Sequence, residues 1–401
     1  MAGDALLGGL SARQFMRVHW QKQPLVVRQA VPPGTAFIPR AALFRLASRD
    51  DVESRLIVRA PGARGTRGAW EVRHGPIARR ALPPLGQPRW TLLVQGLDLH
   101  WEPAFGLLQK FRFIPQARLD DVMISYATPG GGVGPHYDSY DVFLLQVHGS
   151  REWAYGPPDD VRLKPGLPLK ILQRFKPTHR VVLHPGDMLY LPPLWGHDGV
   201  AADECMTCSI GFRAPDVDGL GAELLSRLVD AGTDASGDDP APLYRDPGQA
   251  ATAHPGRIPP ALQRFGRQAA RARLRRTDDI DLALGEALTE PKPRVWFEAR
   301  SGDDPLPPHA LQWGLRLDSR SRMMYDDRHV YLNGESWSAS GVDRRVLCRL
   351  ADDLVLDGAQ VRRAGAALRE LLRQWWNDGW VHDRRPGDDA NDRTNRHLRQ
   401  R

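Results

Sequence analysis

Two histidines and one aspartate are spaced in a pattern typical of a metal site. His136 and Asp138 directly follow a glycine-rich stretch, Pro129-Gly-Gly-Gly-Val-Gly-Pro135. Glycine adopts positive φ and allows close backbone approach, so this stretch predicts a tight turn that ends at the two side chains. In extended backbone, residues two apart point to the same side. We therefore expect His136 and Asp138 to bind one ion together.

A third ligand is predicted at His197, which follows a Pro185-Gly186 turn, a short apolar strand and two prolines. Two imidazoles and one carboxylate leave coordination positions open, as in non-haem iron(II) oxygenases. A bare His-x-Asp is usually an ordinary pair of loop residues, but the surrounding turns favour a metal site. Zinc hydrolysis is the alternative chemistry, and it is less favoured because no glutamate stands beside either histidine in a helical zinc motif.

Composition limits the remaining classes of protein. A chain of 401 residues exceeds one ordinary core and predicts two or three domains. The three cysteines are too few for a disulfide framework. No apolar run approaches the roughly 18 residues of a membrane span, and the first residues lack a signal peptide, so we expect a soluble, cytoplasmic protein. The net charge of +7 is nearly all arginine and permits contact with nucleic acid without showing it.

A β-rich region is predicted between residues 90 and 212, preceded by a short helix over residues 11–20, with Ser11 as its N-cap, and an extended piece at 24–28. Apolar runs bounded by proline and glycine indicate an all-β barrel or sandwich. The predicted strands are 90–94, 121–126, 142–146, 152–155, 180–183, 188–191 and 207–212.

Helical patterns follow Pro215, and Pro291 and Pro293 mark a further boundary. Residues 220–228 and 260–276 predict helices, with a loop at 232–260 between them. An arginine stripe on the second helix fits a solvent-facing surface better than an acidic partner. Beyond residue 293, short strands at 315–317 and 329–332, helices at 344–354 and 359–377, and a strand near 380 predict a winged-helix-like domain. The arginines of that stripe are Arg264, Arg267, Arg271 and Arg275.

The spacing of Cys205 and Cys208 matches the C-x-x-C motif of metal and redox sites. Strand alternation places the two thiols on opposite faces, and the chain has no second pair. A core strand is therefore the better interpretation.

At these motifs the sequence resembles the JmjC ribosomal oxygenases, most closely the bacterial arginine hydroxylases that modify a large-subunit ribosomal protein. The resemblance covers most of the chain. It implies a double-stranded β-helix (cupin/JmjC) core over 96–215 with an N-terminal extension at 1–95. It also implies a helical dimerisation region at 216–292 and a winged helix at 293–382. Residues 383–401 are charged and almost free of apolar side chains, which predicts a disordered tail. The segments that carry the resemblance are 19–24, 120–125, 129–138, 140–143 and 209–215.

The resemblance also implies cofactors and roles for individual residues. Iron(II) is bound by His136, Asp138 and His197, and 2-oxoglutarate and dioxygen are cosubstrates. Arg151 matches the arginine that anchors 2-oxoglutarate, and a guanidinium can hold a carboxylate through two hydrogen bonds. Ser125 and Thr207 would add hydrogen bonds, although some relatives have Asn at the latter position.

A substrate pocket for an arginine side chain needs a carboxylate acceptor and flat walls. Strand alternation places Asp121 and Met123 with Ser125 on one face of their strand, although such a polar face could equally be solvated. We expect Asp121 to receive the guanidinium, Met123 and Tyr140 to pack on its stem, and Ser209 to add a hydrogen bond.

Three alternatives remain open for the function. The same chemistry on a ribosomal histidine, or lysine demethylation, would keep the metal site. A cupin fused to a winged helix could instead be a DNA-binding regulator. Residues 359–377 mix arginines with leucines and tryptophans, which favours packing over base recognition. We therefore expect no sequence-specific nucleic acid binding, and the resemblance implies a homodimer with a ribosomal protein substrate.

Overall fold

Two units make up the computed structural model, which describes residues 5–32, 37–60, 69–157, 160–234, 259–273, 277–300 and 304–384. Most of the first unit lies before Pro215, together with the short segment Arg294–Trp296. The second unit comprises Pro215–Pro293 and Phe297–Arg384. The first division falls close to Pro215, whereas the helical region and the domain predicted to follow it from residue 293 belong to one unit. No helix in the described ranges is long and apolar enough to cross a membrane.

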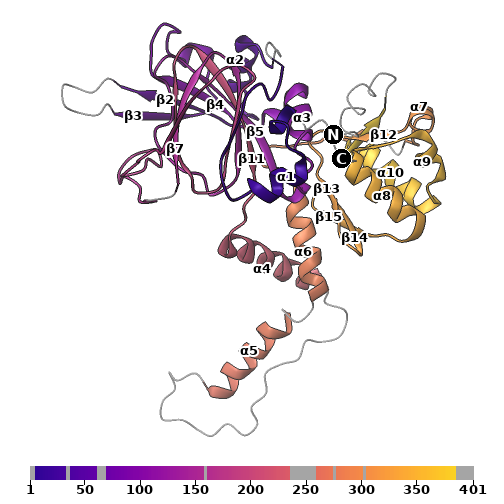
Figure 1. Cartoon of the computed structure of the whole chain (residues 1–401). Helices are drawn as coiled ribbons and strands as arrows, with labels where there is room; N and C mark the ends of the chain where they lie inside the picture. The colour runs from indigo at the N-terminus through magenta and orange to yellow at the C-terminus, as the bar shows by residue number, and fades with distance from the viewer. Residues whose placement is uncertain are drawn as a thin grey trace. The chain divides into compact units, whose positions relative to one another are not determined.

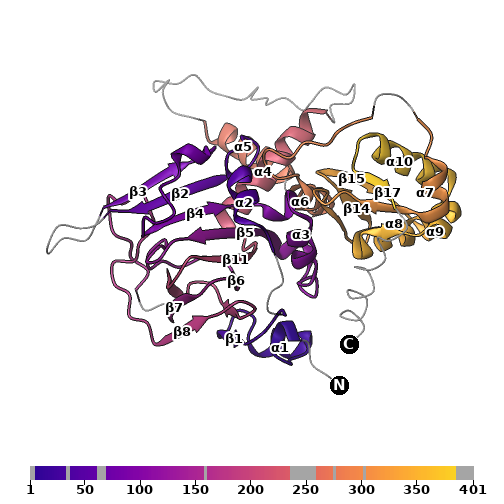
Figure 2. The same ribbon diagram turned by 90° about the horizontal axis from the view of Figure 1, so that it is seen from above.

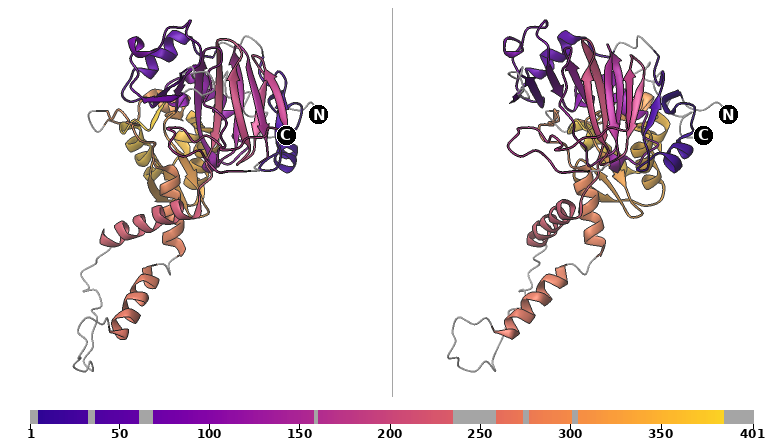
Figure 3. Two further views of the ribbon diagram at one scale, coloured as in Figure 1. Left: turned by 90° about the vertical axis from the view of Figure 1, so that its left-hand side faces the viewer. Right: turned by 60° about the vertical axis from the view of Figure 1, so that its left-hand side comes forward.

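A β-sandwich forms the first unit, as the sequence predicts. Its larger sheet has eight strands in the order β1-β9-β6-β11-β5-β4-β2-β3, and a three-stranded sheet in the order β10-β7-β8 faces it (Figures 2 and 3). All pairings within both sheets are antiparallel. The strands are β1 (Leu25–Val27), β2 (Ser54–Arg59), β3 (Trp70–His74), β4 (Trp90–Val94), β5 (Leu119–Ala127), β6 (Val142–His148), β7 (Arg151–Gly156), β8 (His179–Leu183), β9 (Met188–Leu191), β10 (Gly196–Ala201) and β11 (Cys205–Phe212).

The two faces of the larger sheet have different roles. Side chains of the outer face, such as Val122 and Ile124 of β5, are fully buried in a large apolar core beneath N-terminal helices. The intervening side chains of β5 face the smaller sheet. Because successive residues of a strand alternate between faces, one set stabilises the fold while the other lines the sandwich interior. The helices of this region are α1 (Ala12–Val18), α2 (Arg40–Ala47) and α3 (Glu102–Gln109), labelled in Figure 1.

The N-terminal segment is tied to this core by a cap and an aromatic side chain. Ser11 is the N-cap of α1 as predicted, and it forms a capping box with Gln14. Phe15 is fully buried and packs edge-on against Tyr190 of β9, with ring centroids 5.0 Å apart. The extended piece at 24–28 is β1, which pairs with β9.

Three strands of the sandwich are missing from the sequence prediction. β2 and β3 lie within the predicted N-terminal extension, and β10 carries His197. The sequence of β10, Gly-His-Asp-Gly-Val-Ala, has two glycines and little β-propensity. Its extended backbone is stabilised by six residue pairings with β7 instead.

The second unit combines helices with a small β-rich domain (Figure 1). Helix α4 packs on α6, and α6 also packs on β14 and β15. Leu350, Leu372 and Trp375 are fully buried in this unit's own core. The elements are α4 (Val217–Asp234), α5 (Pro260–Arg273), α6 (Thr277–Thr289), α7 (Pro308–Trp313), α8 (Gly341–Asp353), α9 (Gly358–Arg363), α10 (Ala366–Asn377), β12 (Leu315–Leu317), β13 (Met323–Tyr325), β14 (His329–Leu332), β15 (Glu335–Ser338), β16 (Val355–Leu356) and β17 (Val381–Asp383).

The single helix predicted over residues 359–377 is wrong, because α9 and α10 are separate helices. The chain leaves the helical conformation at Ala364 and Gly365, where the backbone N–H of Gly365 donates to Asp343 of α8 at 2.9 Å. A tertiary hydrogen bond therefore holds the break. Helix α6 was not predicted. The predicted loop and tail lie mostly outside the described residues, as does Arg275.

A buried carboxylate holds the end of β12 to β17. Asp318 accepts hydrogen bonds from Arg320 at 2.8 Å and from His382 at 2.7 Å. Burial alone would raise the pKa of Asp318, but these hydrogen bonds outweigh it and hold the pKa well below its usual range. The charged form of Asp318 therefore stabilises the folded unit.

Candidate active site

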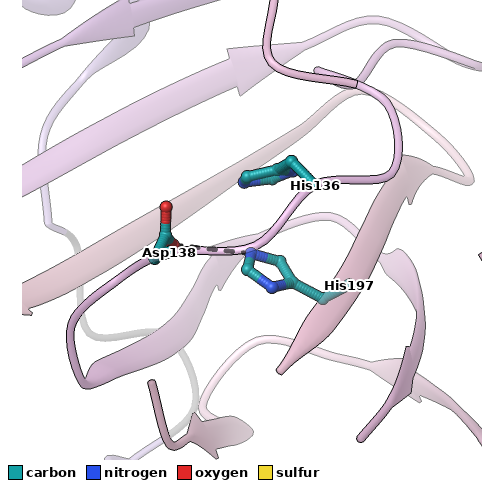
Figure 4. Close-up of side chains that lie close together, drawn as sticks. All are labelled: His136, Asp138 and His197. Carbon is teal, nitrogen blue, oxygen red and sulfur yellow. Dashed lines mark ion pairs between the residues drawn. The ribbon is translucent and has the colours of Figure 1, made fainter. Parts of the chain in front are cut away.

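The predicted metal ligands His136, Asp138 and His197 lie together inside the sandwich (Figure 4). One ligand atom from each residue lies within 4.8 Å of the others, and Oδ2 of Asp138 is 3.6 Å from Nε2 of His197. The three side chains point toward one another, and the two imidazole rings are 4.2 Å apart at their centroids. This donor set and spacing fit a divalent ion with open coordination positions.

Backbone hydrogen bonds hold the two histidines in place. His136 N donates to His197 O at 2.9 Å, and the reverse bond is 2.8 Å, so the segment after the glycine turn pairs with β10. The Nδ1 atoms lie 2.9 Å from the carbonyl oxygens of Gly134 and Trp195. A protonated Nδ1 that donates to a carbonyl fixes the tautomer and leaves the Nε2 lone pair for a metal.

The glycine turn is closely packed where it precedes His136. Gly134 has a φ of +80°, and a Cβ atom at this position would lie 2.6 Å from the Ile171 side chain. A Cβ at Gly132 would lie 2.5 Å from the carbonyl oxygen of Gly199 in β10. Only glycine fits both places without displacing neighbours. The turn therefore positions its following ligands by direct contact with β10.

His197 is suited to metal binding by its surroundings. The residue is 2% exposed, and burial, with the nearby charge of His136, lowers its pKa to about 4. Burial disfavours the charged imidazolium. At neutral pH the ring is therefore uncharged and can act as a ligand.

The predicted cosubstrate residues line the interior beside the metal ligands. Ser125, Thr207 and Gln146 form one cross-strand row through β5, β11 and β6. The Ser125 hydroxyl donates to Thr207 O at 3.3 Å, and the Thr207 hydroxyl donates to Gln146 at 2.8 Å. Both hydroxyls thus already donate within the protein. Gln146 was missed by the sequence analysis, although its place as a polar residue in an apolar strand could have indicated it.

Arg151 is a buried cation with an unused donor. It begins β7 on the smaller sheet and is 5% exposed. Its Nη2 lies 3.6 Å from Cys205 Sγ, whereas its Nε is buried and has no hydrogen-bond partner among the described residues. A buried guanidinium without a carboxylate is unfavourable. This side chain therefore fits the binding of an anionic group that enters the interior.

The predicted substrate residues gather at one end of the same interior face. Met123 and Ser209 are cross-strand partners. A Cβ placed on Gly211 would lie 3.5 Å from the Asp121 carboxylate and 3.9 Å from the Tyr140 ring, so both side chains border this glycine. Asp121 also accepts a hydrogen bond of 2.9 Å from the backbone N–H of Gly96, which holds the carboxylate in place.

The two cysteines of the C-x-x-C spacing lie on opposite faces of β11, as predicted. Cys208 is fully buried in the outer core, where burial raises the pKa of its thiol well above the usual value. Cys205 faces the interior beside Arg151. Both are free cysteines, so this spacing forms no metal or disulfide site.

Comparisons with known proteins agree with this geometry. The JmjC domain family matches residues 106–220, and the ROXA-like winged helix family matches residues 272–382, so the second match includes α6. A probable ribosomal oxygenase of Haemophilus influenzae is 30% identical over 92% of this chain and 95% of its own length.

The chain belongs to the JmjC-domain ribosomal oxygenases.

Among other ribosomal oxygenases, the ribosomal protein uL16 3-hydroxylase of Escherichia coli is 37% identical over 61% of this chain, and the match spans 62% of that relative. The solved structure of the Escherichia coli ribosomal oxygenase YcfD in complex with cobalt and 2-oxoglutarate has a TM-score of 0.73 and 29% identity. That similarity covers 92% of this chain and 97% of the other. The fold described above is therefore similar to that solved structure over nearly its whole length.

Proposed function

We propose that this ribosomal oxygenase is an iron(II)- and 2-oxoglutarate-dependent protein hydroxylase that hydroxylates an arginine side chain of a large-subunit ribosomal protein. The observation that carries the proposal is the set of His136, Asp138 and His197 around one point, together with Arg151 in the same interior, whose buried Nε has no hydrogen-bond partner among the described residues. The relative named as a uL16 3-hydroxylase supports the choice of substrate protein.

The proposed mechanism assigns metal binding and cosubstrate binding to different residues of the site. When bound, iron(II) with dioxygen and 2-oxoglutarate supplies the oxidation: one oxygen atom enters a substrate C–H bond and the other enters succinate, with loss of carbon dioxide. Arg151 would bind the far carboxylate of 2-oxoglutarate, and Ser125 and Thr207, whose hydroxyls donate to protein acceptors in this structure, would redirect them to the cosubstrate. The buried interior excludes water from these charge-assisted bonds and so strengthens them.

An arginine substrate fits the residues around Gly211. The Asp121 carboxylate is held by a backbone N–H and accepts the substrate guanidinium. Tyr140, 38% exposed, and Met123 contact the stem of the arginine, and the Ser209 hydroxyl oxygen accepts a hydrogen bond from its guanidinium group. A carboxylate selects a cationic side chain, which favours arginine over a neutral histidine.

The helical region before the winged helix is proposed to form a homodimer. Leu225 and Val229 on α4 are 50% and 66% exposed, and such apolar exposure is typical of an interface. Multi-angle light scattering would test the dimer: Leu225→Glu should yield a monomer, while a wild-type monomer would contradict the proposal.

A ribosomal protein substrate also supports a cytoplasmic location for the enzyme.

A direct assay tests the activity. Purified protein with iron(II), 2-oxoglutarate and recombinant uL16 should add one oxygen atom to uL16, and fragmentation mass spectrometry should place it on an arginine. His136→Ala should abolish both the modification and succinate formation while the protein remains folded by circular dichroism. Undiminished succinate production by folded His136→Ala would contradict the metal assignment. Modification at a histidine or lysine would contradict the arginine assignment alone.

A further inference from the structure

A second arginine faces the sandwich interior and is not used by the chemistry described so far. Arg55 of β2 pairs with Leu93 of β4, which pairs with Ser125, and this row continues to Thr207. Cross-strand partners lie on the same face of a sheet. The Arg55 side chain therefore projects from the face that carries the cosubstrate and substrate residues, two strands away from Ser125.

Among the residues that the structure describes, the buried Nε atom of Arg55 has no hydrogen-bond partner, and no carboxylate forms an ion pair with the guanidinium. By contrast Arg73, on the neighbouring strand β3, is exposed and pairs with Glu71 at 3.1 Å. A partly buried guanidinium whose donors are unused is costly unless another molecule supplies an acceptor.

Arg55 and Arg151 belong to the two facing sheets of the sandwich. In the cross-strand row of the larger sheet, Arg55 lies at the opposite end from Gln146, with Leu93, Ser125 and Thr207 between them. Arg151 belongs to the facing sheet and lies beside Cys205. The two arginines thus reach the interior from opposite sheets.

We propose that Arg55 is a specificity-determining residue that binds an oxygen acceptor of the ribosomal peptide, either a carboxylate or a main-chain carbonyl next to the modified residue. The proposal rests on the peptide hydroxylase function proposed above. A guanidinium presents a planar fork of donors that matches such oxygens. Asp121 and Arg55 project from the same interior face of the larger sheet, so a cationic side chain of the peptide and a neighbouring oxygen acceptor would each meet a side chain of opposite charge.

Peptide binding measured separately from cosubstrate binding tests this role. Arg55→Gln, Arg55→Lys and the matched control Arg73→Gln are compared by fluorescence anisotropy with a labelled uL16 peptide that spans the modified residue. Arg55→Gln should raise the peptide Kd at least tenfold, equal to 1.4 kcal/mol. Arg55→Lys, which keeps the charge but loses the fork, should have an intermediate effect, and Arg73→Gln should have none.

Steady-state kinetics separate the outcomes. The KM for peptide should rise in Arg55→Gln while the KM for 2-oxoglutarate changes less than twofold. A rise in the KM for 2-oxoglutarate alone, or an unchanged peptide Kd in folded Arg55→Gln, overturns the inference and leaves the hydroxylase function intact. Wild-type protein that neither binds nor modifies uL16 refutes the proposed function itself. If Arg55→Gln fails to fold, the peptide Kd of Arg55→Lys tests the inference instead: an unchanged peptide Kd overturns it.

The source of the acceptor follows from peptide variants. Replacement of each acidic residue of the peptide by its amide removes a carboxylate but keeps the backbone. If one amide replacement weakens peptide binding to the wild-type protein but does not weaken peptide binding to Arg55→Gln, the acceptor is the carboxylate that was replaced. If Arg55→Gln raises the Kd of every amide variant of the peptide as much as it raises the Kd of the unmodified peptide, the acceptor is a main-chain carbonyl.

Discussion

Replacement of Arg151 by methionine should weaken 2-oxoglutarate binding without destabilising the protein. Arg151 is 5% exposed, and its Nε has no acceptor in the described part of the chain. Its closest polar contact is a weak one, 3.6 Å to Cys205 Sγ. The substitution therefore removes no strong bond from the free enzyme, and methionine fills a similar space with a flexible apolar chain.

The size of the effect comes from the bond to the cosubstrate. A charge-assisted hydrogen bond to a carboxylate contributes about 1.5–3 kcal/mol, which corresponds to a roughly ten- to hundredfold higher Kd for 2-oxoglutarate. The free enzyme loses an unpaired buried charge, so its melting temperature should be equal to or above that of the wild type.

Isothermal titration calorimetry of iron(II)-loaded enzyme without oxygen gives the Kd, and calorimetric melting of the metal-free protein gives the stability. Arg180→Met is the matched control, because Arg180 lies on the adjacent strand β8, is 65% exposed and pairs with Glu152. An unchanged Kd for Arg151→Met would show that another cation anchors the cosubstrate. A large loss of stability would show that the guanidinium has a structural role.

Three further substitutions test other parts of the fold. Asp121→Asn keeps an oxygen acceptor for the N–H of Gly96 but removes the charge, so peptide hydroxylation should fall at least tenfold while the Kd for 2-oxoglutarate is unchanged in calorimetry. Gly134→Ala should lower metal affinity roughly tenfold in a chelator competition. The positive φ and close packing of Gly134 disfavour a Cβ atom, and a side chain there would strain the native conformation by about 1–3 kcal/mol. An unchanged metal affinity would contradict the positioning role of the turn. Because the folded pKa of Asp318 is depressed, its charge stabilises the fold above pH ~4, and this stability is lost as the pH falls further. Asp318→Asn should therefore destabilise the second unit by about 3 kcal/mol at pH 7, because it removes the charge and weakens the hydrogen bond to His382. The same substitution should have little effect on stability at low pH. An equal loss of stability at both pH values in thermal melts would refute this reasoning.

The site residues that local sequence predicted are those whose geometry is set locally. His136 and Asp138 follow a turn that requires glycine, so ten consecutive residues determine that the two side chains lie close together. The alternation of β5 likewise separates Asp121 and Met123 from the outer core without reference to any other strand. The His-x-Asp pair and the interior face of β5 could therefore be predicted before the fold was known.

Only the tertiary structure decided which distant strands complete the site. β10 has almost no strand propensity of its own and is extended because it pairs with β7 and with the segment at His136. Arg55 has no distinctive sequence context, and Gln146 is distinguished only as a polar residue in an apolar strand, so the relevance of both comes from the row that runs from β2 to β6. The break between α9 and α10 depends on a hydrogen bond to another helix. Strand register and helix interruption depend on partners far along the chain, and a single sequence does not encode those partners in any local pattern.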